Sequence, residues 1–182
     1  MYATFMAKPH ENEPGSSMHI HQSVLDAKTG KNIFAGKDGK HSRLFLNHIG
    51  GLQRYLAAAL PFCAPNVNSY RRLVPESDAP TNVHWAIDNR TVSLRVPSSS
   101  PANLRVENRV PGADANPYLA FAASLACGYL GMVERIKPSE AVTGSAYRYA
   151  HTLPINLDEA LDKLNYTKSL KQVLGEKFVT AY

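Results

Sequence analysis

Three short segments of the sequence alternate apolar and polar residues, and this alternation constrains the fold more than any other feature. Residues 91–97 (TVSLRVP) and 104–110 (LRVENRV) each separate aliphatic side chains from charged or hydroxyl ones. Residues 17–23 (SMHIHQS) alternate two histidines with Met and Ile. Because successive side chains of a strand point to opposite faces, we expect an antiparallel sheet with one face packed on helices and one polar face.

Helical spacing of apolar residues appears on both sides of these strands. A helix is predicted from Ser42 to about Leu60, with Ser42 as its N-terminal cap and Pro61 at its end. Shorter helical pieces are expected near residues 157–164 and 168–181. Helices and strands together predict an α+β fold.

Residues 116–136 (NPYLAFAASLACGYLGMVERI) form the longest apolar segment. Asn116 can cap a helix there, and Pro117 suits its first turn. Since the segment is apolar nearly all round, we expect this helix to be buried.

The connections between these elements are rich in Gly, Pro, Asn and Asp. Residues 25–41 predict a hairpin followed by a surface loop. Residues 63–82 have no clear period and predict a long loop of the kind that often has a function. The dipeptide "NR" between residues 82–88 and 91–97 resembles a tight hairpin turn.

Composition favours a globular chain that functions in a reducing compartment. The 182 residues are 44% hydrophobic and include two cysteines, which lie in apolar, helix-like segments. No segment resembles a signal peptide or a membrane span, so we expect a cytoplasmic protein without a membrane partner.

The net charge of +5 would allow an anionic partner such as nucleic acid, but the distribution of cations argues against it. Lysine is absent between Lys40 and Lys137, whereas arginine is frequent there. Arginine favours bidentate recognition of phosphate or carboxylate. The arginines of this interval include Arg71, Arg72, Arg90, Arg95, Arg105 and Arg109.

The polar faces of the predicted strands carry residues that can bind a metal. Glu107 lies between Arg105 and Arg109 and would be neutralised by them unless another group needs its charge. A divalent cation such as Mg²⁺ or Mn²⁺ would need that charge, with His19 as a second ligand. Two ligands are too few for a closed site, and strand faces of this kind can also be merely solvated. These residues alone therefore leave the chemistry open.

Four motifs in this order and spacing resemble the catalytic C-terminal domain of glutamine synthetases. They are GSSMHIHQS (15–23), NSYRRLVP (68–75), NRTVSLRVP (89–97) and RVENRVPGADANPYLAFAASLACG (105–128). The resemblance implies a curved antiparallel sheet with helices on one face. It also implies an ATP-dependent ligase that joins the γ-carboxylate of glutamate to ammonia or an amine through γ-glutamyl phosphate, with ATP and Mg²⁺ or Mn²⁺ as cofactors.

The resemblance assigns a role to each matched residue. His19 and Glu107 resemble metal ligands, and Arg90 resembles a residue near both glutamate and the transferred phosphate. His21 could instead be a structural histidine. The matches to glutamate-binding positions are Gly15, Arg72, Arg90 and Arg109, and those to nucleotide-binding positions are His21, Ser23, Arg95 and Arg105.

One departure from the family pattern concerns the acceptor. Residues 72–80 read RLVPESDAP where glutamine synthetases commonly have RLVPGYEAP, so that Asp78 replaces a glutamate that helps to deprotonate bound ammonium. The altered loop favours an organic amine or polyamine over ammonium. A true glutamine synthetase and a degenerate, non-catalytic binding module of the same family remain the alternatives.

The resemblance also bears on the organisation of the chain. Residues 1–182 match the C-terminal part of the catalytic domain, so the N-terminal domain and further metal-binding carboxylates are expected upstream. We therefore expect this chain to be inactive alone, and the complete enzyme to be a homo-oligomer of stacked rings.

Overall fold

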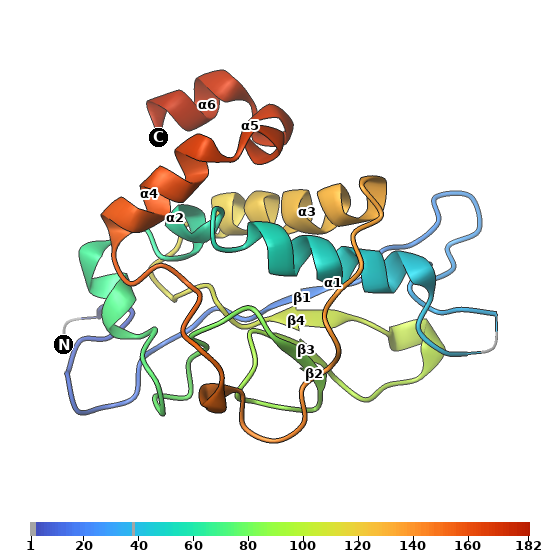
Figure 1. Cartoon of the computed structure of the whole chain (residues 1–182), viewed down its shortest axis with the longest axis horizontal. Coiled ribbons are helices and arrows are strands. Elements are labelled where there is room, and N and C mark those ends of the chain that lie inside the picture. The colour runs from blue at the N-terminus through green and yellow to red at the C-terminus, as the bar shows by residue number, and fades with distance from the viewer. Residues whose placement is uncertain (1–2, 38) are drawn as a thin grey trace.

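A four-stranded sheet forms the centre of the structure, a computed structural model that describes residues 3–37 and 39–182 (Figure 1). The strands lie in the order β1-β4-β3-β2. The pairs β1–β4 and β4–β3 are antiparallel, whereas β2 and β3 are parallel, so the sheet is mixed. The strands are β1 (Ile20–Gln22), β2 (Trp85–Ile87), β3 (Leu94–Val96) and β4 (Val106–Asn108).

Helices cover one face of this sheet, which confirms the α+β class. The two long helices, α1 and α3, lie side by side over the sheet, and α4 to α6 follow beyond them (Figure 1). The α-helices are α1 (Arg43–Tyr55), α2 (Leu60–Cys63), α3 (Pro117–Val133), α4 (Leu157–Tyr166), α5 (Lys168–Leu174) and α6 (Glu176–Ala181). Short 3₁₀ helices span Val67–Arg71, Pro101–Asn103 and Ala146–Arg148.

Helix α1 begins as predicted but ends earlier. The Ser42 hydroxyl accepts a hydrogen bond from the Phe45 amide and caps the helix. The helix ends at Tyr55 rather than near Leu60, and Pro61 lies in the first turn of α2 instead of ending α1. Proline is tolerated in a first turn because its missing amide proton has no partner there anyway.

Helices α1 and α3 touch backbone to backbone. A Cβ atom added at Gly51 would lie 2.2 Å from the Cys127 carbonyl oxygen and 2.5 Å from Gly131 Cα. The main core lies between these helices and the sheet and includes Phe34, Phe45, Ile49, Leu52, Leu94 and Val106. Both cysteines, Cys63 and Cys127, are buried free thiols in this core, as expected.

Only one side of α3 is buried, so the expectation of a fully buried helix was wrong for this chain. Asn116 caps the helix by accepting from the Tyr118 and Leu119 amides, as predicted. The side that faces away from α1 and the sheet remains exposed. Its apolar side chains are Tyr118, Phe121, Leu125, Tyr129 and Val133.

The predicted hairpin between residues 82–88 and 91–97 was also wrong, because β2 and β3 run parallel. The favoured two-residue hairpin turns need positive φ at the first central residue or at both, but neither Asn89 nor Arg90 has one. The Asn89 side chain instead accepts from the Thr91 amide and donates to the Gly144 carbonyl. These bonds stabilise a wider loop that returns the chain to the start of β2.

The expectation of a wholly antiparallel sheet was wrong, because β2 and β3 pair in parallel. The expectations for the hairpin near residue 30 and for the C-terminal helices are confirmed in outline. Leu25 pairs with Asn32 in an antiparallel bridge, which gives the hairpin near residue 30. The predicted C-terminal helices form, with a break at Gly175 (φ 97°). Among the described residues, no helix has both the length and the apolarity to cross a membrane.

Candidate active site

A row of polar side chains crosses the sheet on the face opposite the helices. His21 on β1 and Arg95 on β3 are each the register partner of Glu107 on β4. Their sequence neighbours Ile20 and Leu94 are buried toward the helices. The alternation read from the sequence is therefore confirmed, and three strands contribute to one polar face.

Glu107 is the centre of this face. Its Oε1 atom lies 2.9 Å from His19 Nδ1 and accepts from Arg109 Nη1 at 3.0 Å. Its Oε2 atom accepts from Arg95 Nη1 at 2.9 Å. The side chain is only 3% exposed, so these contacts are largely shielded from water, and such shielding strengthens charge interactions.

The Glu107 carboxylate is strongly biased toward its ionised form. Burial raises its pKa, but hydrogen bonds from His19 and Arg95 and the charge of Arg109 outweigh burial and hold the pKa at about 2. Glu107 is therefore an anion throughout the physiological range, as a metal ligand must be.

His19 Nδ1 and Glu107 Oε1 are joined by a hydrogen bond in this structure, and their spacing also suits two neighbouring ligands of one octahedral cation. Ligands about 2.1 Å from Mg²⁺ at right angles are about 3 Å apart, and the His19–Glu107 separation is 2.9 Å. The other ring nitrogen, Nε2, lies 2.9 Å from Ser17 Oγ, a second contact that orients the imidazole. Within the described part of the chain, no group of three or more His, Cys, Asp or Glu side chains could hold a metal.

His21 and Arg105 form a second contact at the β1 edge of the same face. Arg105 Nε donates to His21 Nδ1 at 3.2 Å, and Arg105 Nη1 donates to the Asn103 carbonyl. Burial lowers the pKa of His21, although Glu107 opposes this effect. A neutral imidazole is consistent with Nδ1 as an acceptor. Ser23 is exposed just beyond β1.

Arg72 lies next to Val110, just beyond the end of β4. Its guanidinium donates to the Val110 carbonyl, and burial lowers its pKa to about 10. Gly15 packs directly behind it, since a Cβ atom added at Gly15 would lie 2.8 Å from Arg72 Cγ and 2.6 Å from the Ala7 carbonyl oxygen. In this structure the Ala7 backbone and the Arg72 side chain together leave no room for a Cβ atom at position 15.

The loop with the altered sequence contacts this row through its backbone. Arg109 Nη2 lies 3.5 Å from the Asp78 carbonyl oxygen, while the Asp78 side chain is exposed and its backbone has φ 58°. Arg90 is exposed in the loop after β2, and no contact within the described structure joins it or Ser23 to Glu107.

Two acidic residues next to the predicted site were missed by the sequence analysis. Asp88 Oδ1 accepts from Arg95 Nη2 at 2.9 Å, opposite the contact between Arg95 and Glu107. Asp114 Oδ2 accepts from Ser69 Oγ at 2.6 Å and raises the pKa of Arg72, against the larger effect of burial. Asp88 directly precedes the NRTVSLRVP motif, which is the one signal that could have identified it.

Comparisons with known proteins identify relatives of this chain. Glutamine synthetase of Pyrococcus woesei is 39% identical over 187 residues, which cover 98% of this chain and 42% of that protein. Gamma-glutamylputrescine synthetase PuuA of Escherichia coli (strain K12) is 40% identical over 183 residues, with coverages of 100% and 39%. Glutamate–isopropylamine ligase of a Pseudomonas species is 38% identical over 188 residues, with coverages of 100% and 41%.

A solved structure described as "Apo GmaS without ligand" has the same fold. It superposes with a TM-score of 0.83 and 33% identity, over 98% of this chain and 43% of that one. The chain thus spans about two fifths of the length of the relatives it matches. The family model for the catalytic domain of glutamine synthetase matches residues 1–182. The chain belongs to the glutamine synthetase catalytic-domain family.

Proposed function

We propose that the protein containing this chain is an ATP-dependent ligase that joins the γ-carboxylate of glutamate to an amine through γ-glutamyl phosphate. The observation that carries the proposal is the convergence of His19, Arg95 and Arg109 on the buried Glu107 carboxylate. This arrangement combines an anionic metal ligand with guanidinium groups suited to phosphate and carboxylate. The names of the relatives, which include ligases for ammonia and for organic amines, support the same reaction class.

Residues at different positions of the polar face would bind the metal, the glutamate and the nucleotide. His19 and Glu107 would hold a divalent cation, which when bound neutralises charge on the phosphoryl group in transfer. Arg72 and Arg109 would bind the glutamate carboxylates beside Gly15, and Arg90 would reach the transferred phosphate from its exposed loop. The nucleotide would contact His21, Ser23 and Arg105 at the β1 edge of the row and Arg95 on β3.

An acidic cavity beside the site supports an organic amine as the acceptor. A cavity of about 290 Å³ lies between residues 8–14 and 74–78, next to the Asp78 carbonyl that Arg109 approaches. Four carboxylates and one lysine line it, an excess of negative charge that would attract a protonated amine. The acidic residues are Glu11, Glu13, Glu76 and Asp78.

A coupled assay of ADP release on the full-length protein tests this function. The acceptors would be ammonium, isopropylamine, putrescine and spermidine, each with glutamate, ATP and Mg²⁺ or Mn²⁺. We expect the highest kcat/KM with an organic amine. The highest value with ammonium would identify a glutamine synthetase instead, and the absence of turnover with every acceptor would favour the non-catalytic module.

A further proposal is that this chain supplies only part of the active site. His19 and Glu107 are two ligands only, so we propose that the remaining carboxylates and the closing domain come from the rest of a longer protein, assembled as a ring-shaped homo-oligomer in the cytoplasm. The purified 182-residue chain should then release no ADP under conditions in which the full-length protein is active. Steady turnover by the chain alone would refute this division.

A further inference from the structure

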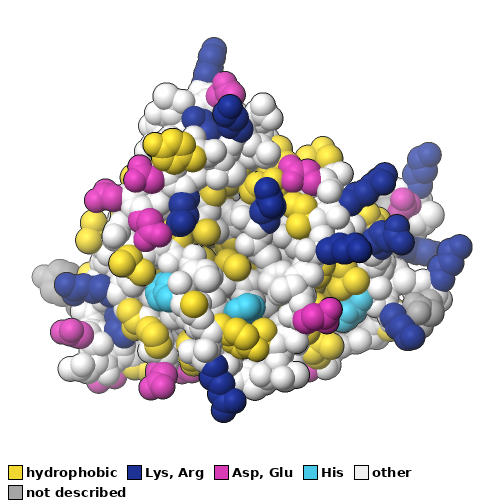
Figure 2. Space-filling model, in the orientation of Figure 1, with side chains coloured by type: hydrophobic (Ala, Val, Ile, Leu, Met, Phe, Trp, Pro, Cys, Tyr) yellow, Lys and Arg dark blue, Asp and Glu magenta, His cyan; other side chains and the backbone are white. Residues whose placement is uncertain are grey.

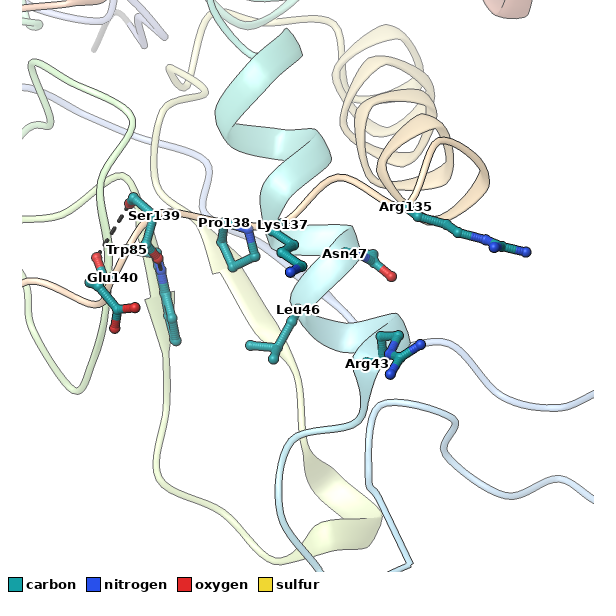
Figure 3. A pocket seen from close by; sticks show the side chains of 9 residues that line it. All are labelled: Arg43, Leu46, Asn47, Trp85, Arg135, Lys137, Pro138, Ser139 and Glu140. Atoms are coloured by element: carbon teal, nitrogen blue, oxygen red, sulfur yellow. Dashed lines mark hydrogen bonds between the residues drawn. The ribbon is translucent and has the colours of Figure 1, made fainter.

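A second cavity, of about 640 Å³, lies on the helix side of the sheet. The start of α1, Trp85 of β2 and residues 135–140 after α3 line it (Figure 3). In the register of β2 and β3, Trp85 is opposite Leu94 and Ala86 is opposite Arg95. Since side chains alternate along a strand, Trp85 points away from the face that carries Arg95 and Glu107. The cavity is therefore separate from the candidate active site, and its volume is typical of small-molecule sites.

One end of this cavity is cationic. Arg43, Arg135 and Lys137 border it, and all three side chains are exposed. None of the three forms an ion pair or a side-chain hydrogen bond with any residue in 3–37 or 39–182. Figure 2 shows Lys and Arg side chains gathered where α3 ends and α1 begins. Uncompensated like charges around a hollow attract an anion.

The backbone at Arg135 adds a second observation. Helix α3 ends at Val133, and Arg135 follows with φ 56°, in the left-handed region. The bond from the Ile136 amide to the Gly131 carbonyl completes this helix end. Glycine is the usual residue in this conformation, so Arg135 adopts it against the backbone preference of arginine. Strained residues of this kind are often found at ligand sites.

The opposite end of the cavity is apolar and fixed in place. Trp85 Nε1 donates to the Ser139 carbonyl at 2.7 Å, so the polar atom of the indole is already satisfied. Gln53 holds Ser139 with two hydrogen bonds of 2.9 Å, one from the Ser139 amide and one to its hydroxyl. In Figure 3, Trp85 and Glu140 lie on one side of α1, and Arg43 and Arg135 on the other. A planar apolar group can therefore pack beside Trp85 without loss of a hydrogen bond.

We propose that this cavity binds a small organic anion with a planar apolar body, of the aryl phosphate or aryl carboxylate class. Its anionic group would contact Arg43, Arg135 and Lys137, and its apolar body would lie against Leu46, Pro138 and Trp85. Glu140 at the apolar end repels an anion and thereby sets the orientation of the ligand. The proposal does not depend on the ligase activity proposed above.

Isothermal titration calorimetry with three probes tests the proposal. Phenyl phosphate contains both chemical parts, inorganic phosphate contains the anion alone, and benzyl alcohol contains the neutral ring alone. We expect phenyl phosphate to bind at least about tenfold more tightly than either partial probe. Trp85 is the only tryptophan of the chain. Phenyl phosphate should therefore change the tryptophan fluorescence of the wild type, and this change should be absent in Trp85→Phe.

Variants then locate the binding. Arg135→Gly removes the guanidinium and also relieves the backbone, so it should fold, and it should weaken phenyl phosphate binding about fivefold or more. Lys137→Ala should act in the same direction, whereas Lys177→Ala, a matched change on exposed α6, should leave binding unchanged. Equal affinity for phenyl phosphate and inorganic phosphate would overturn the proposal. So would binding that survives Arg135→Gly and Lys137→Ala but is lost in Arg95→Ala, because it would then belong to the nucleotide positions.

Discussion

The imidazole of His19 and the carboxylate of Glu107 are 2.9 Å apart because β1 and β4 pair in antiparallel register. His19 directly precedes β1, and Glu107 is the central residue of β4. The two residues lie far apart in the sequence, so the residues next to each of them cannot by themselves bring the side chains together. The sheet register is therefore what creates the candidate metal site, and the arginines on Glu107 hold its carboxylate in position.

Replacement of Glu107 tests this arrangement directly. Glu107→Gln keeps the shape of the side chain but removes the shared counterion of Arg95 and Arg109. Because breaking a buried ion pair leaves charge uncompensated, we expect the free energy of unfolding to fall by about 3 kcal/mol. Mn²⁺ affinity of the full-length protein, measured by calorimetry, should fall about 100-fold.

The control for this change is Glu159→Gln on α4. Glu159 pairs with Lys163 at 3.7 Å on the surface, where such pairs contribute about 1 kcal/mol at most. Unfolding in urea should therefore distinguish the two variants. Unchanged Mn²⁺ affinity in Glu107→Gln would remove Glu107 from the metal site.

Asp88 is predicted to act on the nucleotide through Arg95. Its carboxylate accepts from Arg95 Nη2 while Glu107 accepts from Nη1, so the guanidinium is held from both sides. If the full-length protein has the proposed activity, Asp88→Asn should raise its KM for ATP roughly fivefold, with a smaller effect on kcat, because Arg95 is no longer oriented. The melting temperature should change little, since the Asp88 side chain is 43% exposed.

A matched control for Asp88 is Asp26, whose carboxylate accepts from Thr29 in a distant turn. Asp26→Asn should leave the KM for ATP at the wild-type value. If Asp88→Asn behaves like Asp26→Asn, Arg95 does not need its second carboxylate.

Much of the polar face was predictable because it depends on strand periodicity alone. The alternation in TVSLRVP and LRVENRV placed Arg95 and Glu107 on one face, and the structure agrees. The motif order predicted the family, which the family model and relatives confirm. The position of Asp88 beside a motif could have marked it as a candidate, but its contact with Arg95 depends on the loop between β2 and β3, which the dipeptide "NR" wrongly suggested to be a hairpin.

The errors in the helices have a common physical origin. Apolar spacing continues from Ser42 to Leu60, but the pattern does not record that the chain turns after Tyr55. In the same way, α3 is apolar all round and was therefore expected to be buried on all sides. In the described chain only the side that packs on α1 and the sheet is buried. Periodicity reports which side chains are apolar and not which elements pack against them.

The contact between α1 and α3 predicts a sharp stability effect at Gly131. A Cβ atom there would lie 2.2 Å from the Asn47 carbonyl oxygen and 2.5 Å from Gly51 Cα. Both are backbone atoms, so the helices would have to separate. Gly131→Ala should therefore lower the free energy of unfolding by about 2 kcal/mol, despite the higher helix propensity of alanine.

Urea unfolding measures this effect, with Ala122→Ser on the exposed side of α3 as the control. The control should stay within about 0.5 kcal/mol of the wild type. A Gly131→Ala variant as stable as the wild type would show that α1 and α3 do not approach as closely as described.

His48 predicts how stability depends on pH. It lies on α1 against Phe34 and Gly128, is 1% exposed, and neither ring nitrogen has a partner among the described residues. Burial lowers its pKa to about 4 from 6.5. As the pH falls below 6.5, the unfolded chain takes up a proton on His48 before the folded chain does. Stability should therefore decline from pH 6.5 to about 4, by about 3 kcal/mol in total from this residue.

The measurement is the free energy of unfolding at several pH values, for the wild type and for His48→Gln. Burial also lowers the pKa of His41 and His84, so a shallower decline in the same direction should persist in the variant. His10→Gln, at an exposed position, should retain the full wild-type slope. If His48→Gln and the wild type lose stability in parallel between pH 6.5 and 4, then the imidazole of His48 is protonated in the folded state and must have a partner that this packing does not provide.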